Sequence, residues 1–387
     1  MSFSLPSEIH DAVIDQLYDE PTTLKACCLV SKSWIPRSRR HLSARVEFDN
    51  QEHPFESWMK TFPDPSNSPA HYTRRLSVSY LPEASVSLAT GDDWIRAFCN
   101  VIHFHFERIP WAASVDPGLP LAPLFGFSPT LRSLRLTSTS FEVFDFVCSF
   151  PLLEDLALVD LRPEGGTLGR SAPPTSPKLT GSLDLSATGG IHSATRRLLG
   201  FQDGLRFAKI TVSCIGRDFG SATDLVSRCF DTLKSLNVCC FLTGTFLSLS
   251  LSLARTLPPF VDAVTPRGDF PDLSKATKLR DLMFLGRRSN IHWIIAALQT
   301  VKSKDLQQIT IRLHTATLRN STEETDLQEW QALDRLLVQI WTSHSIRPRL
   351  MYAPNSGGRD TRDRIPSLLP ELTRRELIDL VEYSPPS

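Results

Sequence analysis

The chain has 387 residues, of which 41% are hydrophobic and 22% are charged, proportions that exclude a purely disordered protein. The length exceeds what one ordinary hydrophobic core serves, so two or more domains or one elongated array are expected. Lysine plus arginine and aspartate plus glutamate both number 42, and the net charge of +0 provides no general basic field for nucleic acid or anionic lipid. We therefore expect neither a nucleic-acid partner nor a membrane partner.

The first residues and the cysteines both predict an intracellular protein. Glu8 and Asp11 interrupt the apolar run that a secretory signal needs, and no stretch reaches the roughly 18 apolar residues of a membrane span. The 8 cysteines are scattered, adjacent cysteines are poor disulfide partners, and no C-x-x-C pair occurs. We expect reduced thiols and a cytoplasmic or nuclear location.

Three short helices are predicted in residues 1–45. The first begins at Pro6, and Ile9, Val13 and Leu17, with Ile14 beside them, form one apolar stripe along it. The second contains the apolar segment LKACCLV, and the third begins with another proline. A unit of about 40 residues is usually too small to be stable alone. Its apolar surface therefore needs the rest of the chain or another protein.

The pattern of these residues resembles an F-box, in the form common in mushroom-type fungi. The likeness covers residues 4–45, at Leu5, Pro6, Glu8, Ile9, Ile14, Leu17, Leu24, Cys28, Leu29, Val30, Ser31, Lys32, Trp34, Arg37 and Leu42. It implies a docking module for the Skp-type adaptor of a cullin-type (SCF) ubiquitin ligase. The residues that it implies at this interface, or in support of it, are Leu5, Pro6, Ile9, Leu17, Leu24, Val30 and Trp34. The alternative is a plain helical cap on the following domain.

A weak internal repeat follows a proline-rich break at residues 61–70. The clearest copies are LRSLRL (131–136), LEDLAL (153–158), LKSLNV (233–238), LRDLMF (279–284) and LQQITI (306–311), with looser copies after Leu179 and at LRFAKI (205–210). The last two apolar residues of each copy are two apart, as on one face of a strand. The starts at 131, 153, 179, 205 and 233 give a period in the twenties, which is typical of leucine-rich repeats.

Helical segments are predicted between these strands. They are FEVFDFV (141–147), ATDLVSRCF (222–230) and IHWIIAALQTV (291–301). Two earlier segments, RRLSVSY (74–80) and VIHFHF (101–106), extend the strands toward the helical module. Because strand, helix and strand alternate at this period, the strands are expected to be parallel.

Two insertions and two further helices complete the expected elements. The insertions at 162–178 and 242–268 are rich in turn or small residues, and the Leu/Ser alternation of the second predicts a strand. Residues 325–341 and 373–383 are predicted amphipathic helices, the latter with Thr373 in capping-box spacing to a glutamate. Such helices commonly close the end of a solenoid.

The expected fold class is α/β: a three-helix F-box, an irregular leucine-rich-repeat solenoid with a parallel sheet, and closing helices. The domain boundaries that follow are 1–45 for the F-box, 46–70 for a linker, 71–320 for the array and 321–387 for the helical cap and tail.

Candidate catalytic and ligand-binding groups are few. His103 and His105 share one strand face but lack a third metal ligand nearby, and GGTLGR (165–170) lacks the Lys-Ser/Thr of a phosphate loop. No nucleophile–base or paired-carboxylate set can be assembled from the sequence. We expect no enzyme activity, no metal and no cofactor.

The outward strand positions are the candidate target-binding residues. They are Arg135, Asp184, Lys209, Asn237, Met283 and Thr310. This mixture has no dominant charge and favours a protein surface as the target. The sequence therefore predicts a substrate-receptor subunit, in which the F-box binds the adaptor and the array binds an unknown target protein. The alternative is an F-box-bearing scaffold that delivers no ubiquitination substrate.

Overall fold

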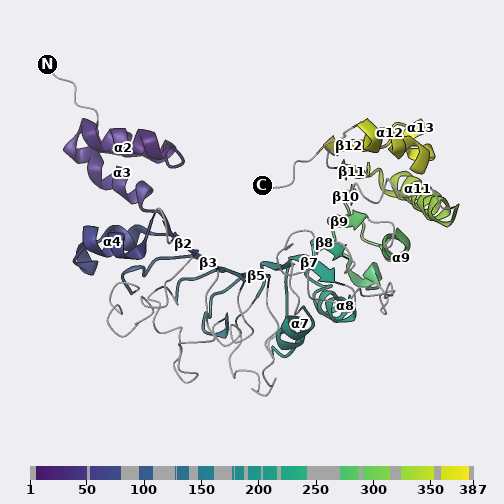
Figure 1. Cartoon of the computed structure of the whole chain (residues 1–387), viewed down its shortest axis with the longest axis horizontal. Coiled ribbons are helices and arrows are strands. Elements are labelled where there is room, and N and C mark those ends of the chain that lie inside the picture. Colours follow the sequence, from purple (N-terminus) through teal and green to yellow (C-terminus); the bar gives the residue numbers. More distant parts are fainter. Residues whose placement is uncertain are drawn as a thin grey trace, which may run out of the picture. The chain divides into compact units, whose positions relative to one another are not determined.

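The computed structural model of the chain shows an α/β protein with parallel strands (Figure 1). It describes residues 6–49, 53–79, 96–107, 127, 129–138, 147–160, 177, 179–186, 191–201, 204–215, 219–241, 271–286, 291–313, 324–352 and 359–382. The chain forms two compact units, Met1–Lys178 and Leu179–Ser387. The boundary between them falls inside the segment that the sequence predicts as one array.

The first unit begins with the expected helices. These are α1 (Ser7–Gln16), α2 (Pro21–Val30) and α3 (Ile35–Leu42), with a 3-10 turn at Lys32–Trp34. Prolines lie in the first turn of α2 and of α3, where the missing N–H leaves no helical hydrogen bond unmade. The side chain of Ser31 accepts the backbone N–H of Ser33 at 3.3 Å and so starts the 3-10 turn.

The strands of the first unit pair in parallel and in chain order. They are β1 (Arg45–Phe48), β2 (Arg75–Val78), β3 (His103–Glu107), β4 (Ser133–Thr137) and β5 (Asp155–Val159). The backbone N–H of Arg75 donates to the carbonyl of Ala44 at 3.0 Å, and the hydroxyl of Thr73 donates to that of Ser43 at 2.9 Å. These bonds join the end of the helical module to the sheet.

The segment 46–70, expected as a linker, contains regular secondary structure of the first unit. It includes most of β1, helix α4 (Phe55–Thr61), the 3-10 turn Pro65–Asn67 and the start of the 3-10 turn Pro69–Tyr72. The side chain of Asp64 accepts the backbone N–H of Ser66 at 2.9 Å, which caps the first turn. The prolines that suggest a break therefore begin short capped turns.

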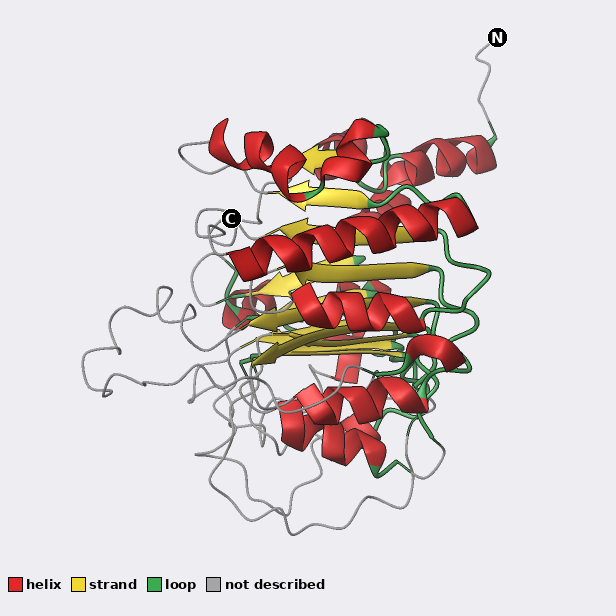
Figure 2. Ribbon diagram, turned by 90° about the vertical axis from the view of Figure 1, so that its right-hand side faces the viewer, coloured by secondary structure: helices red, strands yellow, loops and turns green. Residues whose placement is uncertain are grey.

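The described residues of the second unit form seven parallel strands, also paired in chain order. They are β6 (Ser182–Ser186), β7 (Lys209–Ile215), β8 (Ser235–Phe241), β9 (Asp281–Gly286), β10 (Gln308–Leu313), β11 (Arg349–Tyr352) and β12 (Asp379–Glu382). Its described helices are α7 (Ile191–Leu199), α8 (Phe219–Arg228), α9 (Ile291–Thr300), α11 (Glu324–His344), α12 (Arg359–Leu368) and α13 (Pro370–Arg374). Figure 2 shows helices of this unit in front of its strands. The predicted helices in 222–230, 291–301 and 325–341 are confirmed.

Apolar side chains from neighbouring strands form a continuous buried row in each unit. In the first unit the row is Leu76, Phe104, Leu134 and Leu156. In the second it is Leu183, Ile210, Leu236, Leu282 and Ile309. Because the side-chain period of a strand is two, the intervening residues point to the opposite face. The repeat thus gives the strands of each unit one apolar face. The opposite face carries polar, charged and some apolar residues and is called the mixed face.

The repeat copy at 205–210 is shifted by two residues in the structure. Ile210 pairs with Leu183 and Leu236, so it occupies the fourth position of the repeat and not the sixth. The copy is FAKITV (207–212), and its first residue, Phe207, is fully buried. Leu205 is also buried, ahead of the strand, which explains why it resembles the start of a copy.

The predicted helix at 373–383 is wrong. Helix α13 ends at Arg374, and Glu376 has a φ of 55°, in the left-handed region that ends helices. The chain then continues as β12 beside β11, where Arg349 pairs with Asp379 at 2.8 Å. Pairing with an available strand edge has overridden the local helical pattern.

Three predicted segments lie outside the described residues. They are the helix at 141–147, apart from Val147, and the insertions at 162–178, apart from Pro177, and at 242–268.

Candidate functional site

Exposed apolar side chains are concentrated in the helical module. Nine large apolar side chains are exposed in the described part of the chain, and five of them belong to the first 30 residues. With their exposed fractions they are Ile9 (46%), Val13 (51%), Tyr18 (59%), Leu29 (89%) and Val30 (67%). So much apolar surface on two short helices is typical of a protein-binding site.

Helix α1 explains part of this exposure. Its one fully buried apolar residue is Ile14, which faces the module's interior. The other members of the predicted stripe are not buried, because Ile9 and Val13 are exposed and Leu17 is half-buried. The stripe is therefore left largely uncovered by the module's own core.

The predicted adaptor-binding residues divide by exposure. Pro6, Ile9 and Val30 are exposed, and Leu24 is 1% exposed, so Leu24 supports the surface from within. Leu17 and Trp34 are half-buried, and the Trp34 ring lies 5.5 Å from the His10 ring, centroid to centroid. Leu5 lies outside the described residues. Exposure adds Val13, Tyr18 and Leu29, which the sequence-based set of site residues lacks.

A polar cluster joins the first and third helices of the module. Asp15 of α1 accepts hydrogen bonds from the Arg37 guanidinium at 2.6 Å and from His41 Nε2 at 2.7 Å, both from α3. The bonds from Arg37 and then from His41 hold the pKa of the Asp15 carboxyl well below its usual range. The cluster fixes the position of α1, and with it the exposed stripe.

The low pKa of Asp15 predicts a loss of module stability in acid. Its stabilising effect is present above the ordinary carboxyl pKa of about 4 and is lost as the pH falls toward the lower folded-state pKa. We expect Asp15→Asn to lower the melting temperature at neutral pH, with a smaller difference from wild type at about pH 3. Circular dichroism melts at the two pH values measure this.

The control for this experiment is Asp11→Asn on the same helix. Asp11 acts on Arg37 only through space, so its removal should change the melting temperature less at neutral pH. An Asp15→Asn difference that is equal at both pH values would contradict the assigned role of the cluster.

The mixed face of the first unit contains a hollow of about 370 Å³. Its lining residues come from β1 to β4: Arg45, Val46, Glu47, Arg75, Leu76, Ser77, His103, Phe104, His105, Ser133 and Arg135. Arg135, a predicted target-binding residue, is exposed here.

The mixed face of the second unit has a hollow of about 300 Å³. It brings together four of the predicted target-binding residues: Lys209, Asn237, Met283 and Thr310. Thr310 is only 5% exposed, and its hydroxyl accepts a hydrogen bond from the Gln308 side chain at 3.2 Å. Thr310 lies in register with Met283 but is buried, unlike the exposed position that the sequence predicts for it.

Asp184 and Thr211 occupy the same outward repeat position as Asn237. Asp184 lies beside Thr211, which lines the hollow and pairs with Asn237 on the next strand. Thr211 therefore occupies the repeat position that the sequence assigns to Lys209. The shifted register at 207–212 explains this miss, because Lys209 lies on the same face but two residues earlier.

Of the two histidines of β3, His105 makes polar contacts with side chains of the neighbouring strands. Within the described ranges no group of three metal-ligating side chains occurs. The His105 ring instead lies 3.3 Å from the Ser77 hydroxyl and 3.3 Å from the Thr137 hydroxyl. Burial, and then the charges of Arg75 and Arg135 respectively, lower the pKa values of His103 and His105.

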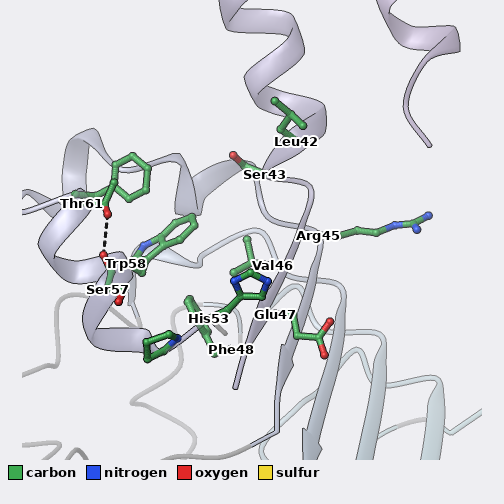
Figure 3. A pocket seen from close by; sticks show the side chains of 12 residues that line it. Leu42, Ser43, Arg45, Val46, Glu47, Phe48, His53, Ser57, Trp58 and Thr61 are labelled. Carbon is green, nitrogen blue, oxygen red and sulfur yellow. Dashed lines mark hydrogen bonds between the residues drawn. The ribbon is translucent and has the colours of Figure 1, made fainter. Parts of the chain in front are cut away.

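A third hollow, of about 440 Å³, lies where the helical module meets the sheet (Figure 3). Leu42 and Ser43 mark the end of α3, and Trp58 of α4 faces strand β1. The Trp58 ring of α4 packs 5.8 Å from the Phe48 ring of β1, measured between centroids. This aromatic contact anchors α4 beside the first strand.

A buried cysteine and the character of the helices are the remaining features of the described chain. Burial raises the pKa of the Cys229 thiol to about 11, which makes it a packing group and not a nucleophile. Among the helices that the structure describes, none combines the length and apolar character needed to cross a membrane.

The candidate site therefore has two parts: the exposed apolar residues of the helical module and the mixed faces of the two units. Comparison with known proteins assigns neither part. No protein-family model matches the chain, and no curated protein matches it either.

Proposed function

We propose that the chain is a substrate-receptor subunit of a cullin-type ubiquitin ligase. In this proposal residues 1–45 are an F-box that binds the Skp-type adaptor. The strands and helices that follow are degenerate leucine-rich repeats, and their mixed faces bind a target protein. The observation that carries the proposal is the outward-facing apolar surface of α1 and α2, where Leu29 is 89% exposed and Val30 is 67% exposed.

Two further features support this division of roles. The residues that resemble an F-box include both Leu29 and Val30, so the resemblance and the exposed surface coincide. The parallel strands each present polar residues on one face, as a repeat protein does when it binds another protein through that face. The module supplies attachment, and the sheet faces supply recognition.

Substitutions in the exposed apolar surface should weaken adaptor binding. Leu29→Asp places a carboxylate in an apolar interface, and Trp34→Ala removes an aromatic ring that supports α1. Buried aromatic anchors often contribute about 2 kcal/mol or more, so we expect at least about a 30-fold loss of affinity for each variant. Calorimetric titration of a purified Skp-type adaptor into the full-length protein measures this.

The matched control is Leu152→Asp. Leu152 is 48% exposed in the first unit but lies outside the helical module, so its substitution should leave the affinity unchanged. Equal affinities for wild type and both module variants, with melting curves unchanged, would remove this surface from the adaptor interface.

A ubiquitination assay separates a receptor from a scaffold. We expect a protein captured by the chain to be ubiquitinated when the adaptor and cullin subunits are present, and not when the chain carries Leu29→Asp. Capture without adaptor-dependent ubiquitination would favour the scaffold.

A further inference from the structure

Arginine outnumbers carboxylate among the side chains that line the hollow of the first unit. The charged side chains that line its hollow are three arginines and one glutamate: Arg45, Arg75, Arg135 and Glu47. Arg45 and Arg75 lie directly opposite each other on β1 and β2. Like charges in this position destabilise a sheet, so the arrangement needs a reason beyond stability.

The chain's own carboxylates neutralise this charge only in part. Arg45 pairs with Asp19 at 3.0 Å, but both side chains are more than half exposed, at 62% and 53%, which makes the pair weak. For Arg75 and Arg135, the described residues provide no ion-pair partner. Their guanidinium groups are available to a ligand.

The two histidines stand between these arginines. His103 lies beside Arg75 on the neighbouring strand, and His105 lies beside Arg135. The hydroxyls of Ser77 and Thr137, each 3.3 Å from a nitrogen of the His105 ring, hold the ring in place across three strands. We call five of these residues the basic face: Arg45, Arg75, His103, His105 and Arg135.

We propose that the basic face binds an acidic segment of a protein, with Arg75 and Arg135 contacting its Asp and Glu side chains. Charge complementarity supports this occupant, because guanidinium groups recognise carboxylates through paired hydrogen bonds. Arg75 and Arg135 lie two strands apart and two residues out of register, a separation of roughly 12 Å. Groups so far apart suit several carboxylates along an extended segment better than one compact phosphate.

This inference deepens the proposed function, on which it rests for the identification of the acidic segment as part of a target. The two remain separable, because acidic-peptide binding is read on the sheet face and adaptor binding on the helical module. A protein that binds the adaptor but not the acidic peptide contradicts only this inference. A protein that binds the acidic peptide but not the adaptor contradicts only the proposed function.

Binding of a labelled hexaglutamate peptide to the full-length protein tests the inference. By fluorescence anisotropy at about 50 mM salt, we expect the double variant Arg75→Gln/Arg135→Gln to bind about tenfold more weakly than wild type. Arg74→Gln/Arg132→Gln is the matched control: it also removes two arginine charges, from exposed residues that do not line the hollow. We expect this control to bind like wild type.

Comparison peptides distinguish the outcomes. Hexaglutamine should not bind. Equal losses for the two double variants would show nonspecific charge attraction and overturn the site. A phosphoserine peptide of equal length that binds much more tightly than hexaglutamate would overturn the assignment to carboxylates. Unmeasurable hexaglutamate binding to a folded wild-type protein would overturn the proposal as a whole.

The pH dependence of binding provides a second readout. His103 faces Arg75 and Asp155, and His105 faces Arg135, Glu107 and Glu47. A bound acidic peptide favours the protonated rings, so the affinity should rise as the pH falls from about 7.5 to about 5.5. The double variant His103→Gln/His105→Gln should flatten this dependence. An unchanged pH profile in that variant would remove the histidines from the site.

Discussion

Leu134→Asp should unfold the first unit, and Leu282→Asp should unfold the second. Each leucine is 1% exposed and lies within a buried row, beside Phe104 for Leu134 and Leu236 for Leu282. Loss of the leucine side chain costs about 2–5 kcal/mol, and an unpaired buried carboxylate costs several more. Together these match or exceed a typical domain stability of about 5–15 kcal/mol. Circular dichroism melts and limited proteolysis measure the result.

Conservative and outward-facing substitutions are the controls. Leu134→Met and Leu282→Met keep the side-chain volume and should cost less than about 1.5 kcal/mol. Asn237→Asp introduces the same carboxylate on the mixed face and should leave the fold intact. Wild-type stability in either buried Asp variant would mean that the assigned strand register is wrong.

Asp334→Ala should destabilise the end of the second unit. Asp334 lies in α11, is 1% exposed, and accepts the backbone N–H groups of Glu371 at 2.7 Å and Leu372 at 3.0 Å. It therefore caps α13 from a different helix. Each hydrogen bond to a charged group contributes about 1.5–3 kcal/mol, so we expect a loss of about 3 kcal/mol or more in urea denaturation.

Asp334→Asn is the partner experiment. An asparagine retains one acceptor oxygen, so its loss of stability should be about half that of the alanine variant. An unchanged urea midpoint in Asp334→Ala would show that α13 does not depend on this cap.

The strands could be predicted because one short pattern determines both their conformation and their burial. In LRSLRL and its copies, the two final leucines fix the buried face, and the same alternation fixes the outward residues. This is why Asn237 and Met283 line the hollow of the second unit as expected. The copies that deviate are those with a different anchor, such as Phe207 in place of a leucine.

Strand β12 has a repeat pattern that can also be interpreted as a helix. Residues 377–382 read LIDLVE, a repeat copy whose final apolar residue is replaced by glutamate. Leu377 is 4% exposed, as expected of the first residue of a copy. The same letters also satisfy a helical period, and only the edge of β11 decides between the two conformations.

The candidate site was less predictable because it depends on how elements pack. The sequence identifies an apolar stripe on α1, but only the packing decides that Ile14 is buried while Ile9 and Val13 face outward. The basic face combines residues from strands up to 90 positions apart in the chain, Arg45 and Arg135. Its charges are hidden in a sequence whose overall net charge is +0.

Hydrogen–deuterium exchange of the full-length protein with and without a Skp-type adaptor tests the central claim most directly. The account predicts a stable complex in which new protection is confined to the helical module, chiefly in α1 and α2. Unchanged exchange in Ser7–Val30, or protection found only on the strands, would contradict it.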